Sequence, residues 1–112
     1  MRKTILLTAV ASSLLTLAAV LPSKVSLENS RVKVTETTYL PGVPRDRHIR
    51  PTDQVIVFMD DCKYQRIDSK TGEKTVRERK AGEVIWHDKG EDAPVLINLG
   101  KKPYRTLTIA LK

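Results

Sequence analysis

Residues 48–54 bring together three side chains whose chemistry suits an anion. His48, Arg50 and Gln54 are separated by one and then three residues. An imidazole exchanges a proton near neutral pH, a guanidinium is a permanent cation with five donors, and an amide both donates and accepts hydrogen bonds. Arg50 can therefore hold a carboxylate, sulfate or phosphate through two parallel hydrogen bonds.

The elements around these residues must turn them toward one space. Residues of equal parity lie on one face of a strand, so Arg50, Gln54, Ile56 and Phe58 look together into the interior if the strand is regular. His48 then joins them at the mouth. We expect a cavity with an apolar floor and a polar rim, the usual form of a small-molecule site. In the alternative, Arg50 turns outward and pairs with an acid such as Asp53.

Trp86 and His87 are further candidates for the ligand site, but they are adjacent and face opposite ways on a strand. Trp86 is the sole tryptophan, and it either packs in the core or stacks on a ligand. His87 lies between Trp86 and Asp88 and close to Glu91. It either exchanges protons with a ligand or only stabilises a turn through a hydrogen bond. Only one of the two can line the interior.

The strand pattern predicts an all-β fold. Residues 31–40 are rich in Val, Thr and Tyr, and alternation places Val32, Val34, Thr38 and Leu40 on the half-buried face. Residues 54–59 are almost continuously apolar, which is typical of a central strand buried on both faces. Residues 43–50 are interrupted by prolines and predict a loop or an irregular strand.

The second half of the chain continues with short strands between turns. Residues 63–68 and 74–79 flank Ser-Lys-Thr-Gly and predict a hairpin, whose many charges we interpret as protection of an exposed edge. Residues 81–90 hold a short strand between two glycine-bearing turns, interpreted as half of a hairpin. With residues 95–99 and 104–111, about eight short strands are expected, in a sandwich or barrel.

The first residues predict export. Arg2 and Lys3 precede an apolar run that ends in small residues, the pattern of a signal peptide removed after about residue 19; an uncleaved membrane anchor is the alternative. Removal of residues 1–19 leaves 18 basic and 13 acidic residues, a net charge of +5. The basic residues are interspersed with acidic ones, so nucleic acid is not an expected partner. After removal of the signal peptide we expect a single domain at residues 24–112. Cys62 is the only cysteine and is interpreted as a half-buried apolar residue.

The spacing of five residues resembles the first motif of the cupins: glycine, five residues, histidine, one residue, histidine, three or four residues, glutamate, six residues, glycine. In that frame stand Gly42, His48, Arg50, Gln54 and Asp61. The second motif, with glycine, proline, glycine, histidine and asparagine, falls on Gly82, Asp88, Gly90, Ala93 and Ile97, with Asn98 one place late. The resemblance implies a single cupin-type jelly-roll β-barrel.

The departures from these motifs concern the metal site that the resemblance implies. Such a site uses three imidazoles and one carboxylate, and of these only His48 is present. Arg50 has no lone pair to give, Gln54 is a weak oxygen donor, and Ala93 offers none. Asp92 could supply a substitute carboxylate. We therefore predict no tightly bound metal and no other cofactor.

Three classes of function follow from this reasoning. The first is an exported, non-catalytic module that binds a small anionic molecule, or a partner protein, through His48, Arg50, Gln54, Phe58, Trp86 and His87. The second is an enzyme, either a metal-dependent oxygenase or isomerase with a rebuilt site, or an acid–base catalyst using His48 and His87. The third is a structural dimer module. Similar small cupins are often dimeric, so the resemblance implies a homodimer, without membrane attachment after cleavage of the signal peptide.

Overall fold

The computed structural model describes residues 20–112, and the predicted signal peptide at residues 1–19 lies outside the described residues. This part of the chain is built of strands and contains no helix long and apolar enough to cross a bilayer. The strands are β1 (Ser23–Glu28), β2 (Val32–Tyr39), β3 (Pro44–Arg45), β4 (His48–Ile49), β5 (Gln54–Phe58), β6 (Cys62–Ile67), β7 (Lys74–Arg79), β8 (Val84–His87), β9 (Asp92–Ala93), β10 (Val95–Asn98) and β11 (Tyr104–Leu111).

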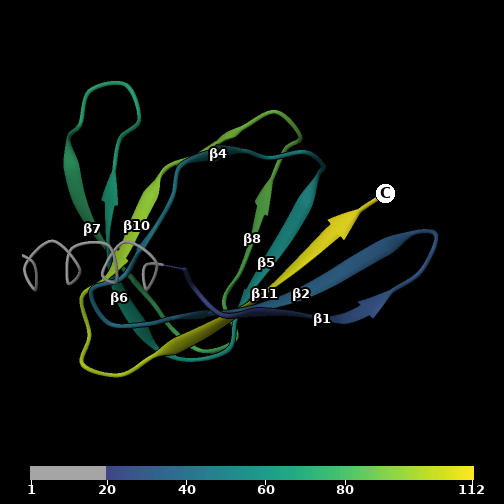
Figure 1. Ribbon diagram of the computed structural model, residues 1–112, viewed down its shortest axis with the longest axis horizontal. Coiled ribbons are helices and arrows are strands. Elements are labelled where there is room, and N and C mark those ends of the chain that lie inside the picture. Colours follow the sequence, from purple (N-terminus) through teal and green to yellow (C-terminus); the bar gives the residue numbers. More distant parts are fainter. Residues whose placement is uncertain (1–19) are drawn as a thin grey trace, which may run out of the picture.

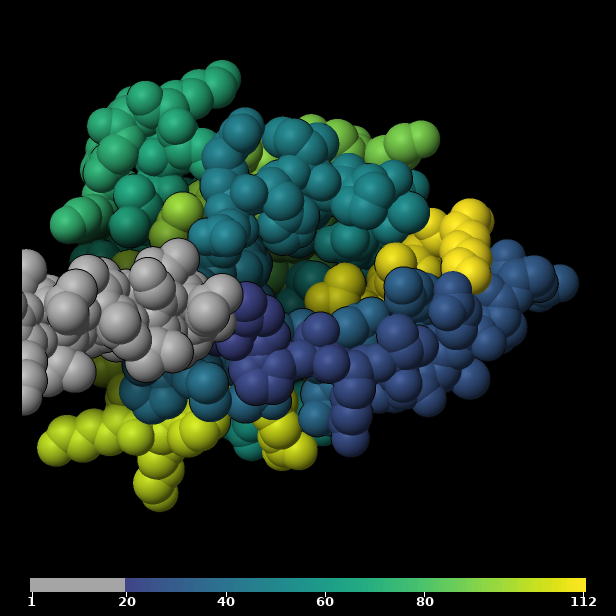
Figure 2. Space-filling view, viewed as in Figure 1, coloured from purple at the N-terminus to yellow at the C-terminus, as the bar shows by residue number. Residues whose placement is uncertain are grey.

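Two antiparallel sheets form the walls of a barrel (Figure 1). The larger sheet has the order β1-β2-β11-β5-β8, the smaller has the order β3-β10-β6-β7, and β4 pairs with β9 at one end. In Figure 1 the β6–β7 hairpin and the β1–β2 turn project from opposite sides of the barrel, and Figure 2 shows the same two extensions at its surface. The all-β jelly-roll prediction is confirmed, and the additional strands are β1 and the two-residue pieces β3, β4 and β9.

The faces of two strands differ from their predictions. In β5, Gln54, Ile56 and Phe58 are buried, whereas Val55 and Val57 on the other face are half-buried. The strand alternates because only one face of the larger sheet meets the cavity. In β2, Thr35, Thr37 and Tyr39 face the interior, so the prediction that Val32, Val34, Thr38 and Leu40 form the buried face was wrong. The prediction assumed that the apolar face of the strand is the buried one, whereas the inward face of this strand is polar and its outward face is apolar.

The core is a line of aromatic rings. Tyr39 and Tyr104 stack at 4.7 Å between centroids, Tyr64 follows Tyr104 at 6.2 Å, and Phe58 follows Tyr64 at 6.3 Å. These are all three tyrosines and the one phenylalanine of the chain. Each is 6% exposed or less. Because a cavity occupies the middle of the barrel, these rings carry much of the packing between the sheets.

Glycine-bearing turns place the strands that hold the candidate site. Gly82 and Gly90, on either side of β8, have φ of 91° and 88°, a conformation that side chains with a Cβ rarely adopt. The strand β8 does not form a hairpin with a neighbour in sequence, because its hydrogen-bonded partner is β5, with Gln54 opposite His87. The interpretation of residues 81–90 as half of a hairpin was therefore wrong.

The outer face of the larger sheet is apolar. Direct pairing aligns Leu27, Val34, Ile109, Val55 and Trp86 in one row across its five strands. A second row contains Leu107, Val57 and Val84. Several of these side chains are widely exposed, for example Val84 at 61% and Trp86 at 52%. A solvated sheet face is usually polar, so this one differs from the ordinary pattern.

Candidate functional site

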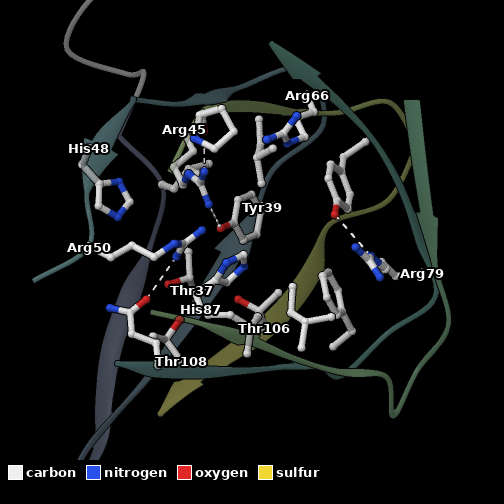
Figure 3. A pocket seen from close by; sticks show the side chains of 18 of the residues that line it. Thr37, Tyr39, Arg45, His48, Arg50, Arg66, Arg79, His87, Thr106 and Thr108 are labelled. Carbon is white, nitrogen blue, oxygen red and sulfur yellow. Dashed lines mark hydrogen bonds between the residues drawn. The ribbon is translucent and has the colours of Figure 1, made fainter. Parts of the chain in front are cut away.

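A cavity of about 580 Å³ lies between the two sheets, within the usual size of a site for a small organic molecule. Its wall combines arginines, histidines, threonines and the aromatic core (Figure 3). The lining residues are Leu21, Ser23, Thr35, Thr37, Tyr39, Arg45, His48, Arg50, Gln54, Ile56, Phe58, Tyr64, Arg66, Arg77, Arg79, Ile85, His87, Glu91, Asp92, Pro94, Leu96, Tyr104, Thr106 and Thr108.

Arg50 is the most unusual of these side chains. Its backbone N–H donates to the Glu91 carbonyl at 2.9 Å, and its carbonyl accepts from the Gly90 N–H at 2.9 Å, so the residue is fixed beside β9. The side chain is 6% exposed and donates from Nη1 to Gln54 Oε1 at 3.1 Å. Its Nε is buried and has no hydrogen-bond partner among residues 20–112. The alternative in which Arg50 turns outward to Asp53 is excluded by this geometry.

A second arginine lies close to it. Arg45, in β3, donates from Nη1 to the Tyr39 hydroxyl at 3.3 Å and from Nη2 to the Pro94 carbonyl, while its Nε has no partner. Burial and then the charge of Arg45 hold the pKa of Arg50 below its ordinary value. Two guanidinium groups that disfavour each other in a cavity gain from an anion placed between them.

His48 and His87 occupy the same end of the cavity, and Figure 3 draws both facing the region of Arg50. Desolvation holds the pKa of His48 below its usual value, and the charges of Arg45 and Arg50 act in the same direction. The His87 Nδ1 lies 2.8 Å from Glu91 Oε2. That contact fixes the ring and leaves Nε2 for a ligand.

Trp86 is outside the cavity, so its prediction as a ligand-binding residue was wrong. It points from the outer face of β8, is 52% exposed, and donates from Nε1 to Asp88 Oδ1 at 2.8 Å. Adjacent residues on a strand face opposite ways, and His87 takes the inward position. Its packing in the core, the other interpretation, does not occur either. The remaining candidates, His48, Arg50, Gln54, Phe58 and His87, lie in the cavity wall, and their binding of a ligand stays a prediction.

Three arginines of the β6–β7 hairpin were missed as site residues. Arg66, Arg77 and Arg79 line the cavity, although the charges of this hairpin had been interpreted as edge protection. Arg79 donates from Nε to the Tyr64 hydroxyl at 3.4 Å, and its guanidinium lies 5.5 Å above the Phe58 ring. Strand parity places Tyr64 and Arg66 on the same face of one strand, and Arg77 and Arg79 on the same face of the next. It does not determine which of the two faces of each strand meets the interior.

The charge of the cavity wall is positive. Five arginines line it, against the two carboxylates Glu91 and Asp92. Both carboxylates already have partners, since Glu91 contacts His87 at 2.8 Å and Asp92 accepts from Arg47 Nε at 2.6 Å. Hydrogen bonds from Ser69 and Arg47 hold the pKa of Asp92 below its ordinary value, so it stays ionised. Within the part of the chain that the structure describes, Arg50 thus has no carboxylate in direct contact.

The metal site that the cupin motifs imply does not fit these residues. His48 and Ala93 are direct partners on β4 and β9, as the motif frame expects for two ligands, but Ala93 contributes a methyl group. Arg50 stands where the motif has its second histidine, and Gln54 Oε1 already accepts a hydrogen bond from Arg50 Nη1. Among residues 20–112 no group of three or more His, Cys, Asp or Glu side chains could hold a metal ion. A cation placed here would meet Arg50 instead of a lone pair.

Comparison with solved structures establishes the fold. A cupin domain from Bordetella pertussis superposes with a TM-score of 0.73 at 23% identity, over 82% of this chain and 93% of that one. The polyketide cyclase RemF from Streptomyces resistomycificus gives 0.64 at 16% identity, over 80% and 63%. The DMSP lyase DddQ from Ruegeria pomeroyi gives 0.63 at 10% identity, over 82% and 47%.

No family model matches the sequence, and no curated protein is detectably similar to it in sequence. The described residues nevertheless have the cupin fold, and the resemblance to the cupins is confirmed at the level of the structure. Proteins of this fold include enzymes, among them the cyclase and the lyase just named. At these identities the likeness concerns the fold, and function depends on the site.

Proposed function

We propose that the protein binds a small organic anion inside the barrel, without catalysing its conversion. The observation that carries this proposal is the buried guanidinium of Arg50, with an unpartnered Nε and no carboxylate in contact. A buried charge is costly unless it is paired. An acidic ligand between Arg45 and Arg50 supplies the missing partner and uses the bidentate geometry of guanidinium groups.

The ligand is small because the cavity is bounded by the two sheets and measures about 580 Å³. The charge of the ligand is negative, because the cavity wall has more arginines than carboxylates and both carboxylates already have protein partners. Gln54 and His87 can donate to or accept from its polar groups. Phe58 and Ile56 supply the apolar floor. This arrangement supports binding and orientation of one organic acid.

Calorimetry with a panel of small carboxylates and phosphates tests the proposal. Arg50→Gln should weaken binding of every anion by at least about tenfold, as expected for loss of a hydrogen-bonded charge pair. Arg31→Gln is the matched control, because it removes one positive charge from an exposed position outside the cavity and should leave affinity within about twofold. Equal affinities of the Arg50 variant and the wild type would contradict the proposal.

A proton-transfer enzyme is the second candidate, and the His87–Glu91 contact favours it. A histidine oriented by a carboxylate and facing a cationic pocket can remove a proton beside a bound carboxylate. Under this hypothesis His87→Gln retains binding of the anion but stops exchange of the ligand's α-protons with deuterium oxide, followed by NMR. Absence of any exchange in the wild type would exclude this proton transfer and leave the binding proposal as the first candidate.

We also propose that the protein is exported and forms a homodimer. Export rests on the pattern of residues 1–19, and the mass of the protein recovered from cells decides whether they are removed. The homodimer rests on the apolar outer face of the five-stranded sheet, where one apolar row crosses all five strands and a second crosses β11, β5 and β8. Four strand spacings make the first row roughly 19 Å long, and such a strip can form the apolar centre of a standard-sized interface.

A second copy is the occupant that suits this face best. Lys24 and Glu36 continue the second row on β1 and β2 as an ion pair, and Lys112 pairs with Glu28, so the charges of this face are balanced and it selects no strongly charged partner. A twofold axis would bring the same apolar rows together. Trp86, exposed at one end of the first row, would then be buried in the interface.

A further inference from the structure

The size of the cavity shows that an acidic group alone does not fill it. A carboxylate or phosphate takes up roughly two or three water volumes of about 30 Å³ each. The cavity measures about 580 Å³. The ligand of the proposed function therefore has a body, and the wall away from Arg50 indicates the chemistry of that body.

Four threonines of β2 and β11 form a hydroxyl-bearing square in the wall of the cavity. Thr37 is the direct partner of Thr106, and Thr35 of Thr108, on the neighbouring strands β2 and β11. All four line the cavity. Cross-strand partners have Cβ atoms about 5 Å apart, and same-face neighbours along a strand lie about 6.7 Å apart. The square is thus about as large as one six-membered sugar ring.

The four threonine side chains lie in the cavity wall, and within residues 20–112 no side-chain hydrogen bond joins one of them to another. Figure 3 draws Thr37, Thr106 and Thr108 among the lining side chains, and no hydrogen bond joins them to the other residues drawn. Ser23, the partner of Thr37 on β1, adds a fifth hydroxyl to this wall. The Tyr104 hydroxyl, on a side chain 2% exposed, is buried without a hydrogen-bond partner.

Arginines face these hydroxyls from the smaller sheet. Arg45 and Arg66 flank Leu96 as its partners on either side in one row of that sheet, and both line the cavity. A hydrocarbon body would remove water from the threonine hydroxyls without replacing their hydrogen bonds, which costs free energy. A body that carries several hydroxyl groups satisfies them, and its apolar C–H face packs on the aromatic core.

We propose that the ligand is an acidic sugar, a uronic acid of one or two rings. Its carboxylate lies between Arg45 and Arg50, its hydroxyl groups meet the threonine square, and its ring packs against the aromatic residues. This inference rests on the proposed function, since it takes anion binding at Arg50 as given. It adds a chemical class to that anion, carried by the threonine square.

Calorimetry with matched ligands tests the sugar class. Glucuronate, galacturonate and digalacturonate are compared with cyclohexanecarboxylate, which keeps the ring and the carboxylate but lacks the hydroxyl groups, and with glucose, which lacks the charge. We expect the best uronate to bind at least about tenfold more tightly than cyclohexanecarboxylate, because a site built to form hydrogen bonds rejects an analogue without them. Glucose should bind at least tenfold more weakly than that uronate.

Protein variants separate the hydroxyls from the charge. Thr37→Val with Thr108→Val keeps the shape and removes two hydroxyls, and should weaken uronate binding by about threefold to tenfold per lost hydrogen bond while leaving cyclohexanecarboxylate unchanged or tighter. Thr38→Val, on the outer face of the same strand, is the control and should change neither affinity. Circular dichroism confirms that each variant is folded.

The outcomes distinguish this inference from the proposed function. If cyclohexanecarboxylate binds as tightly as the best uronate, or if the double threonine variant binds uronate normally, the sugar class is wrong while anion binding stands. If no anion binds and Arg50→Gln changes nothing, the proposed function itself fails. Uronate binding that is lost in both the Arg50 and the threonine variants supports both.

Discussion

Replacement of Arg50 by methionine should make the unliganded protein more stable while it abolishes binding of the anion. The Arg50 side chain is 6% exposed, and its one side-chain hydrogen bond is to Gln54. Burial and the neighbouring Arg45 both lower its pKa, which means that the folded state disfavours its charge. Methionine has a similar length and no charge, and the two backbone hydrogen bonds of residue 50 remain.

The magnitude follows from two opposing terms. Replacing a poorly compensated buried charge by an apolar side chain stabilises proteins by up to a few kcal/mol, of which we take about 3. Loss of the Arg50 donor leaves Gln54 Oε1 unpaired, which costs about 1–2 kcal/mol. The net gain is about 1–2 kcal/mol, and for a domain of this size it raises Tm by roughly 4–16 °C.

Thermal unfolding followed by circular dichroism, with and without a saturating anionic ligand, is the assay. The ligand should raise the Tm of the wild type, because it binds the folded state, and leave the variant unchanged. Arg31→Met, at an exposed arginine, should shift stability by less than about 0.5 kcal/mol. A lower Tm for unliganded Arg50→Met would refute the reasoning, since it would mean that Arg50 serves the fold and not a ligand.

Three further predictions concern other parts of the molecule. Anion affinity should increase as pH falls below about 6.5, because the unliganded site holds the pKa of His48 below its usual value and a bound anion raises that pKa. Calorimetry at two pH values measures this dependence, which should be absent in His48→Gln. Asn98→Asp should destabilise the fold by at least about 3 kcal/mol in urea unfolding. Asn98 Nδ2 donates to the carbonyls of Tyr39 and Lys102, both at 2.9 Å, and the substitution places a carboxylate oxygen against these carbonyls. Equal stability of the variant and the wild type would contradict this role of Asn98. Trp86→Lys should convert a dimer into a monomer in light scattering, and a monomeric wild type would disprove the interface.

Local sequence patterns were sufficient to predict the strands and much of the candidate site. Alternation along residues 50–58 put Arg50, Gln54 and Phe58 on one face, and they do line the cavity. Glycines at motif spacing predicted turns, and Gly42 has φ of 73° there. These features were predictable because parity and turn conformation depend on residues close together in the chain.

The identity of the inward face depended on the tertiary structure. In β2 the apolar side chains lie outside and Thr35 and Thr37 lie inside, because the strand borders a polar cavity rather than a packed core. Trp86 lies outside for the same reason that His87 lies inside: pairing of β8 with β5 fixes the register. Arg66 and Arg77 join the site only because β6 and β7 belong to the smaller sheet, which forms one wall of the cavity. Parity divides residues into two faces, whereas long-range pairing decides which face meets the cavity.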